Sequence, residues 1–157
     1  MDPNIHIRPF VPGDGKAFRE LNELWITRYF VLEPADVEAL SHPYEHYIEP
    51  GGEILMVLDG ATAIGCCALI NEGHGVYEVS KMTMREDYRG LGLGRRLLQS
   101  VIDAAKDKGS SKVFLVTNSS LGSAVHLYES VGFQHVPRES LPQSPYQRGN
   151  VFMAMEF

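Results

Sequence analysis

The 157-residue sequence has few cysteines, and its histidines are scattered. Cys66 and Cys67 are adjacent in an apolar segment, and neighbours on a strand point to opposite faces of a sheet. We therefore expect two buried thiols rather than a disulfide or a shared metal site. The histidines show no spacing typical of metal ligands. This cysteine usage favours a reducing, cytoplasmic setting and predicts no bound metal.

The sequence also lacks long apolar runs and an excess of positive charge. No apolar stretch approaches the roughly 20 residues that span a bilayer. Residues 1–4 show no basic region leading into an apolar segment, so we expect no signal peptide and no membrane partner. The formal net charge is −6, which argues against a nucleic-acid partner because such proteins present a basic face. Without repeats or a linker, the length predicts a single domain over residues 1–157.

The apolar periodicity predicts a mixed α/β protein, in the order β-α-α-β-β-β-α-β-α-β-β. Asp59-Gly60 between two strand-like runs predicts a hairpin, and Asp14 is expected to cap the first helix. A helix between two strands predicts a parallel pair with a right-handed crossover. The expected strands are 5–9, 54–58, 61–70, 76–84, 112–117, 133–136 and 151–157, the expected helices are 14–30, 34–40, 92–107 and 120–130, and 42–52 is expected to be a loop.

A glycine-rich turn is the most informative local feature. Arg89-Gly-Leu-Gly-Leu-Gly-Arg95 lies between a predicted strand and a predicted helix. Glycines leave backbone N–H groups open to a ligand, and the first N–H groups of a helix have no partner within it. Together with the helix dipole and the two arginines, they predict a site for a pyrophosphate.

The spacing of this turn departs from two common phosphate-binding motifs. A P-loop has Gly-Lys-Ser/Thr at its end, whereas Arg95-Arg96 stands here. A dinucleotide fingerprint has Gly-x-Gly-x-x-Gly, but the third glycine comes one residue early. The pattern Arg89-x-x-Gly92-x-Gly94 resembles instead the coenzyme A signature of the GNAT superfamily of N-acetyltransferases. A second block, Asn118 followed by Ala124-Val-His-Leu-Tyr128-Glu-Ser-Val-Gly-Phe133, is similar to that superfamily's later segment.

This resemblance implies a GNAT-type fold and acetyl transfer from acetyl-coenzyme A to a primary amine by direct attack in a ternary complex. Tyr128 is then the expected acid at the leaving sulfur. Glu78 is the expected base, because an amine with a pKa near that of lysine must lose a proton before it attacks. An even offset on one strand is expected to place Glu78 and Met84 on the same face. The expected coenzyme contacts are Met82, Thr83, Met84, Arg89, Gly90, Leu91, Gly92, Leu93, Gly94, Arg95, Asn118 and Tyr128.

The acceptor is expected to bind between the first helices and the late loop. Aromatic residues there can wall a pocket, and an arginine can hold a substrate carboxylate in bidentate fashion. The candidates are Trp25, Arg28, Tyr29, Tyr146 and Arg148. A small-molecule amine is expected rather than a protein substrate, and either a monomer or a homodimer fits. Three alternatives stay open: a protein N-acetyltransferase, an acyl-coenzyme A sensor without turnover, and a nucleotide-binding regulatory domain.

Overall fold

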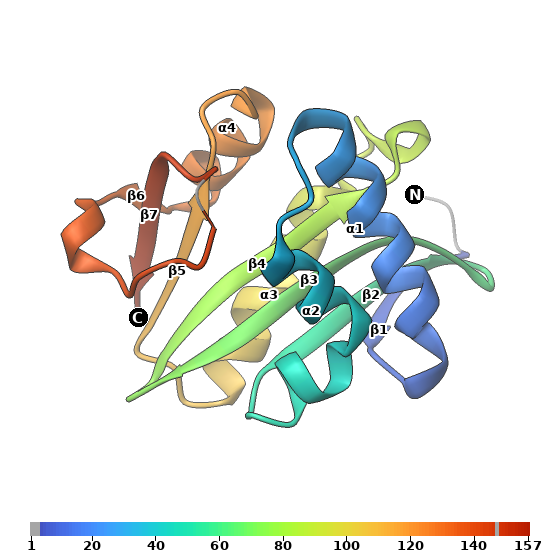
Figure 1. Ribbon diagram of the computed structural model, residues 1–157, viewed down its shortest axis with the longest axis horizontal. Coiled ribbons are helices and arrows are strands. Elements are labelled where there is room, and N and C mark those ends of the chain that lie inside the picture. Colours follow the sequence, from blue (N-terminus) through green and yellow to red (C-terminus); the bar gives the residue numbers. More distant parts are fainter. Residues whose placement is uncertain (1–3, 147) are drawn as a thin grey trace.

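A computed structural model describes residues 4–146 and 148–157 of the chain. They form a seven-stranded mixed sheet with strand order β1-β2-β3-β4-β5-β7-β6 (Figure 1). The strands are β1 (Ile5–Pro9), β2 (Glu53–Asp59), β3 (Thr62–Gly73), β4 (Val76–Met84), β5 (Lys112–Thr117), β6 (Gln134–His135) and β7 (Val151–Glu156). The helices are α1 (Gly15–Tyr29), α2 (Pro34–Ser41), α3 (Leu93–Asp107) and α4 (Gly122–Val131). The predicted fold class and element order are confirmed.

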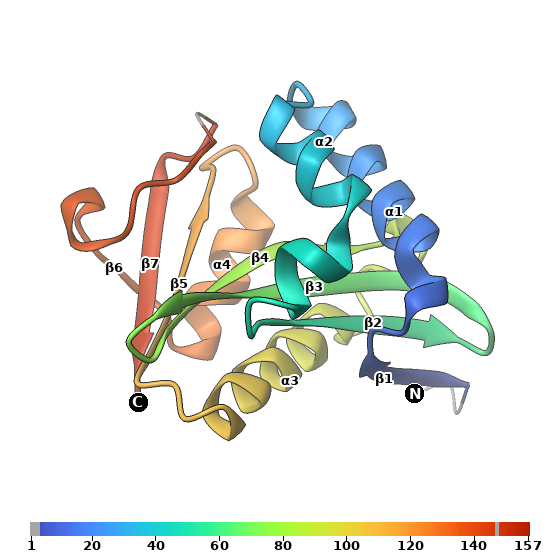
Figure 2. The ribbon, with the colours of Figure 1, turned by 60° about the horizontal axis from the view of Figure 1, so that its bottom comes forward.

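Helices cover both faces of the sheet. Figure 2 shows α1 and α2 on one face and α3 on the opposite face. The α3 side is buried through Leu97, Leu98 and Val101, which recur at helical spacing and pack with Tyr128 of α4. Cys67 belongs to this core and Cys66 to the core under α1 and α2. Both thiols are buried and free, as the sequence predicts.

The sheet opens between β4 and β5. These parallel strands pair only where Val76–Glu78 face Lys112–Phe114. Beyond Glu78, a bulge interrupts β4: Ala68 on β3 faces Ser80, whereas Cys66 faces Thr83. Lys81 lies in this bulge with a φ of 54°, in the left-handed region. The free edge of β4 and the diverging β5 therefore leave a cleft between them.

The bulge also corrects one prediction about Glu78. Glu78 faces Ile70, which packs under α1 and α2, whereas Met84 belongs to the core under α3. The expectation that Glu78 and Met84 share a face is wrong, because the extra residue at the bulge reverses the alternation.

Two local predictions near the N-terminal helices also need correction. The segment expected as a loop at 42–52 contains a helical turn, Tyr44–Ile48. This turn buries the side chain of its own Tyr47 against the core. Asp14 precedes α1, but its carboxylate does not cap that helix. It accepts hydrogen bonds from Arg8 and from the backbone N–H of Val11 instead.

Candidate active site

The opening between β4 and β5 forms a cleft of ≈ 530 Å³. It brings together residues that the sequence assigned to three separate roles. Two expected residues are not part of its lining: Leu91, which is exposed, and Arg28, which donates a hydrogen bond to Glu86 on the surface. The predicted residues that line it are Trp25, Tyr29, Glu78, Met82, Thr83, Met84, Arg89, Gly90, Gly92, Leu93, Gly94, Arg95, Asn118, Tyr128, Tyr146 and Arg148.

The glycine turn forms one end of the cleft. Gly90 and Gly92 have φ angles of 80° and 76°, which only glycine adopts without strain. Gly92 is the N-cap of α3, and the first hydrogen bond there runs from the Arg96 N–H to the Gly92 carbonyl, at 3.2 Å. The preceding N–H groups of the helix are therefore available to an anion.

Tyr128 lies on α4 beside the middle of β4. Its ring packs edge-on against Phe133, and the side chain is 8% exposed. The hydroxyl points to the Sδ of Met82, at 3.9 Å. Since a thioether is a weak acceptor, the hydroxyl can give this contact up to a stronger one. Burial raises the pKa of Tyr128 above its usual value, so the phenol stays protonated through the neutral range.

Glu78 lies where β4 and β5 separate. Burial and the nearby Glu72 carboxylate raise the pKa of Glu78 to about 8, although the positive charge of Lys81 opposes the shift. A carboxyl with this pKa exchanges its proton close to neutral pH, which suits a general base. Its position in the cleft wall is consistent with that role.

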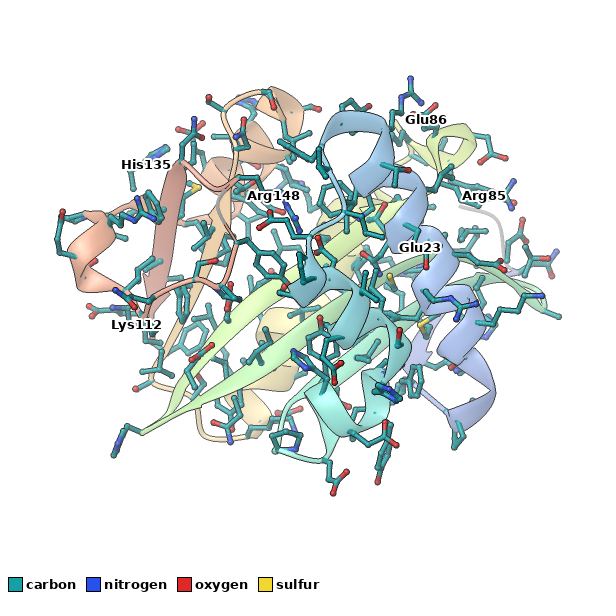
Figure 3. All side chains as sticks on the ribbon, in the orientation of Figure 1. Glu23, Arg85, Glu86, Lys112, His135 and Arg148 are labelled. Atoms are coloured by element: carbon teal, nitrogen blue, oxygen red, sulfur yellow. The ribbon has the colours of Figure 1, made fainter. Side chains whose placement is uncertain are left out.

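A buried cluster of charged side chains adjoins the cleft. Its central residue, Asp36, was not among the site residues predicted from the sequence. Asp36 on α2 is fully buried and accepts hydrogen bonds from Lys81 at 2.9 Å and from Arg148 at 2.7 and 2.8 Å. Lys81 also donates to the Tyr146 hydroxyl at 2.9 Å, and Arg148 donates to Glu33 at 3.1 Å. In Figure 3, Arg148 lies where the C-terminal loop meets the start of α2.

The charges of this cluster control one another's protonation. Burial raises the pKa of Asp36, but the bonds from Arg148 and Lys81 outweigh it and bring the pKa to about 2. The only local signal for Asp36 was its place in the first turn of α2, where an aspartate serves as a cap. Its partners are 45 and 112 residues away in the chain, so spacing gave no indication of them.

Asn118, expected from the sequence to contact the coenzyme, makes hydrogen bonds within the protein. Its Nδ2 donates to the Arg148 carbonyl at 2.5 Å, and its Oδ1 accepts from the Ser120 N–H. Within residues 4–146 and 148–157, no group of His, Cys, Asp or Glu side chains is placed to hold a metal ion. No helix in those residues is long and apolar enough to cross a membrane.

Comparison with known proteins identifies the family. A sequence model of the Acetyltransferase (GNAT) family matches residues 18–133. An uncharacterized N-acetyltransferase of Schizosaccharomyces pombe is 35% identical over 129 residues, which are 79% of this chain and 78% of that protein. An IAA acetyltransferase of Azospirillum brasilense is 30% identical over 98% of this chain and 97% of its own length. A GNAT-family acetyltransferase structure from Staphylococcus aureus superposes with a TM-score of 0.89 at 22% identity, covering 97% and 98% of the two chains.

The chain belongs to the GNAT acetyltransferase family, and it is an acetyl-coenzyme A-dependent N-acetyltransferase. The relatives differ in length: the match covers only 41% of the mycothiol acetyltransferase of Cellulomonas flavigena. A spermidine N-acetyltransferase from Vibrio cholerae, crystallised with coenzyme A and spermine, shares the fold with a TM-score of 0.73 at 23% identity, covering 98% of this chain and 95% of that one.

Proposed function

We propose that the protein acetylates the primary amine of a small molecule whose body is apolar or aromatic. The single observation that carries this proposal is the continuous cleft, which joins the glycine turn to an aromatic end containing Trp25, Tyr29 and Tyr146. A cleft of ≈ 530 Å³ lies in the range of small-ligand sites.

The glycine turn and the free edge of β4 fit the coenzyme. The N–H groups at the start of α3, together with Arg89 and Arg95, suit a pyrophosphate. Arg95 already donates to Ser130 at 2.6 Å, so its guanidinium is held beside the turn. Met82, Thr83 and Met84 lie beyond the pairing with β5, and we propose that their backbone pairs with the extended arm of the coenzyme. When bound, acetyl-coenzyme A supplies the acetyl thioester.

We propose that Glu78 takes the proton from the amine nitrogen, directly or through water. Tyr128 then donates a hydrogen bond to the leaving sulfur from its buried hydroxyl. Because its raised pKa makes the Tyr128 phenol a weak acid, we expect it to contribute a hydrogen bond to the sulfur rather than a proton. Both groups line the same cleft.

Two experiments test this function. Calorimetry with coenzyme A, acetyl-coenzyme A and ATP separates the proposal from a nucleotide-binding domain, because only the coenzymes are expected to bind. Thiol release from acetyl-coenzyme A on mixing with primary amines and with peptides separates it from a sensor and from a protein acetyltransferase. Binding without release in the presence of any amine would contradict the proposal. A cytoplasmic location and a monomeric or homodimeric state remain predictions from the sequence.

A further inference from the structure

The buried cluster around Asp36 connects the two sides of the cleft. The backbone of the C-terminal loop is fixed to β5, because the Arg148 carbonyl accepts from Asn118 and the Asn150 N–H donates to the Thr117 carbonyl at 2.8 Å. From there the Arg148 side chain reaches across to Asp36 on α2. Lys81 reaches the same carboxylate from the bulge of β4. Asp36 thus links three segments, which are its own helix α2, the bulge of β4 and the C-terminal loop.

The cluster places two cations at the acceptor end of the cleft and pairs both of them. The Lys81 and Asp36 side chains are 2% and 0% exposed, so neither is solvated by bulk water. Both terminal nitrogens of Arg148 donate to Asp36, and one of them also donates to Glu33. With two cations and two carboxylates, the formal charge of the cluster is zero.

This pairing has a consequence for the acceptor. A substrate carboxylate beside the amine would need a cation that is not already paired with a carboxylate. Of the two arginines that the sequence offers for that role, Arg28 lies outside the cleft lining, and Arg148 already donates to Asp36 and Glu33. The buried carboxylate of Asp36 also sits behind both cations and repels a second anion. The surrounding wall is aromatic, formed by Phe30 and Tyr146 beside Arg148 and by Trp25 against Phe30.

We propose that Asp36 is a specificity-determining, positioning residue that makes the acceptor pocket select amines lacking a carboxylate, such as aralkylamines. The inference rests on the proposed function and names its substrate class. Asp36 acts through Lys81 and Arg148, since it is not part of the cleft lining. Its loss would leave one uncompensated cation beside the bound amine.

The test compares tyramine with tyrosine, which share an aromatic body and differ by one carboxylate. For the wild-type enzyme we expect kcat/KM for tyrosine to be at least about ten-fold below that for tyramine. In Asp36→Asn the ratio of the two values should move toward tyrosine by about ten-fold, because a charge-assisted hydrogen bond becomes available. Since one substrate pair is compared across variants, the different amine pKa values cancel. Coenzyme A affinity should stay unchanged.

Two further variants keep the test independent of folding. Lys81→Met removes a cation and should move the preference further toward tyramine. Asp36→Asn combined with Lys81→Met restores a neutral cluster and should restore the wild-type ratio, which a merely structural role would not do. The matched control is Asp14→Asn, which removes another buried aspartate bonded in bidentate fashion to an arginine, Arg8, but away from the cleft. Its ratio should equal that of the wild type.

The outcomes are distinguishable. If the wild type acetylates tyrosine as well as tyramine, the inference is overturned while the proposed function stands. An unchanged ratio in the folded Asp36→Asn protein and in Lys81→Met also overturns it. If coenzyme A binds but none of the amines is acetylated, the proposed function fails and the inference fails with it.

Discussion

At the scale of single residues, Glu78 allows the sharpest kinetic prediction. A carboxyl with a pKa of about 8 is protonated at pH 6 and ionised at pH 9, and only the ionised form accepts a proton. The value of kcat/KM for the amine should therefore rise more steeply with pH below about 8 than above it, where only deprotonation of the amine itself still adds to the rise. Glu78→Gln should lower kcat/KM by about 10²–10⁴-fold and leave only the shallower rise that follows the amine, in a series of initial rates from pH 6 to 10.

The control for Glu78 is Glu20→Gln, an exposed carboxylate on α1 that pairs only loosely with Lys16 at 3.9 Å. It should leave the pH profile unchanged. A Glu78→Gln enzyme with the wild-type profile would remove Glu78 from the reaction and leave a water chain as the base.

Tyr128 supports a smaller prediction. Tyr128→Phe keeps the ring contact with Phe133 and loses only the hydroxyl, whose contact with Met82 is weak. Because a buried phenol with a raised pKa contributes a hydrogen bond rather than a proton, kcat should fall about five-fold, which corresponds to about 1 kcal/mol. Coenzyme A affinity, measured by calorimetry, should not change. An unaltered kcat at saturating substrates would contradict the assignment.

At the scale of elements, the turn before α3 can be tested against the turn after it. Gly92 and Gly109 have φ angles of 76° and 81°, and a Cβ at either position would meet no atom within 4 Å. Replacing either by alanine should cost about 1–2 kcal/mol of folding free energy, because both residues have a left-handed backbone conformation. Only Gly92→Ala should weaken coenzyme A binding, since Gly109 does not line the cleft. Urea unfolding and calorimetry measure the two effects, and equal affinities would contradict the anion site.

The same elements show what the sequence could predict. Alternation, the Asp59-Gly60 turn and the stripe of α3 are local patterns, so they located the strands, the hairpin and the helix. The glycine turn was recognisable for the same reason. The bulge at Lys81 was not, because it arises from pairing between β3 and β4 that alternation within β4 does not encode. Asp36 was missed because its role depends on partners brought together only by the tertiary fold.

At the scale of the whole molecule, the cleft divides the sheet into β1–β4 and β5–β7. The short pairing of Val76–Glu78 with Lys112–Phe114 and the bond from Arg148 to Asp36 join the two parts, and the core under α3 spans both of them. A ligand in this cleft contacts both parts and adds its binding free energy to folding. The free energy of unfolding should therefore rise strongly when the coenzyme binds.

Coenzyme A at 100 times its Kd should raise stability by about 2.7 kcal/mol. For a chain of this size, about 2–4 °C per kcal/mol gives a rise in Tm of about 5–11 °C, measured by a thermal melt. At the same coenzyme concentration the rise should be smaller for Gly92→Ala and unchanged for Gly109→Ala. An equal rise in Tm with ATP would show that the turn binds phosphates and that the rest of the coenzyme adds nothing to binding. It would contradict the proposal that the free edge of β4 binds the extended arm of the coenzyme.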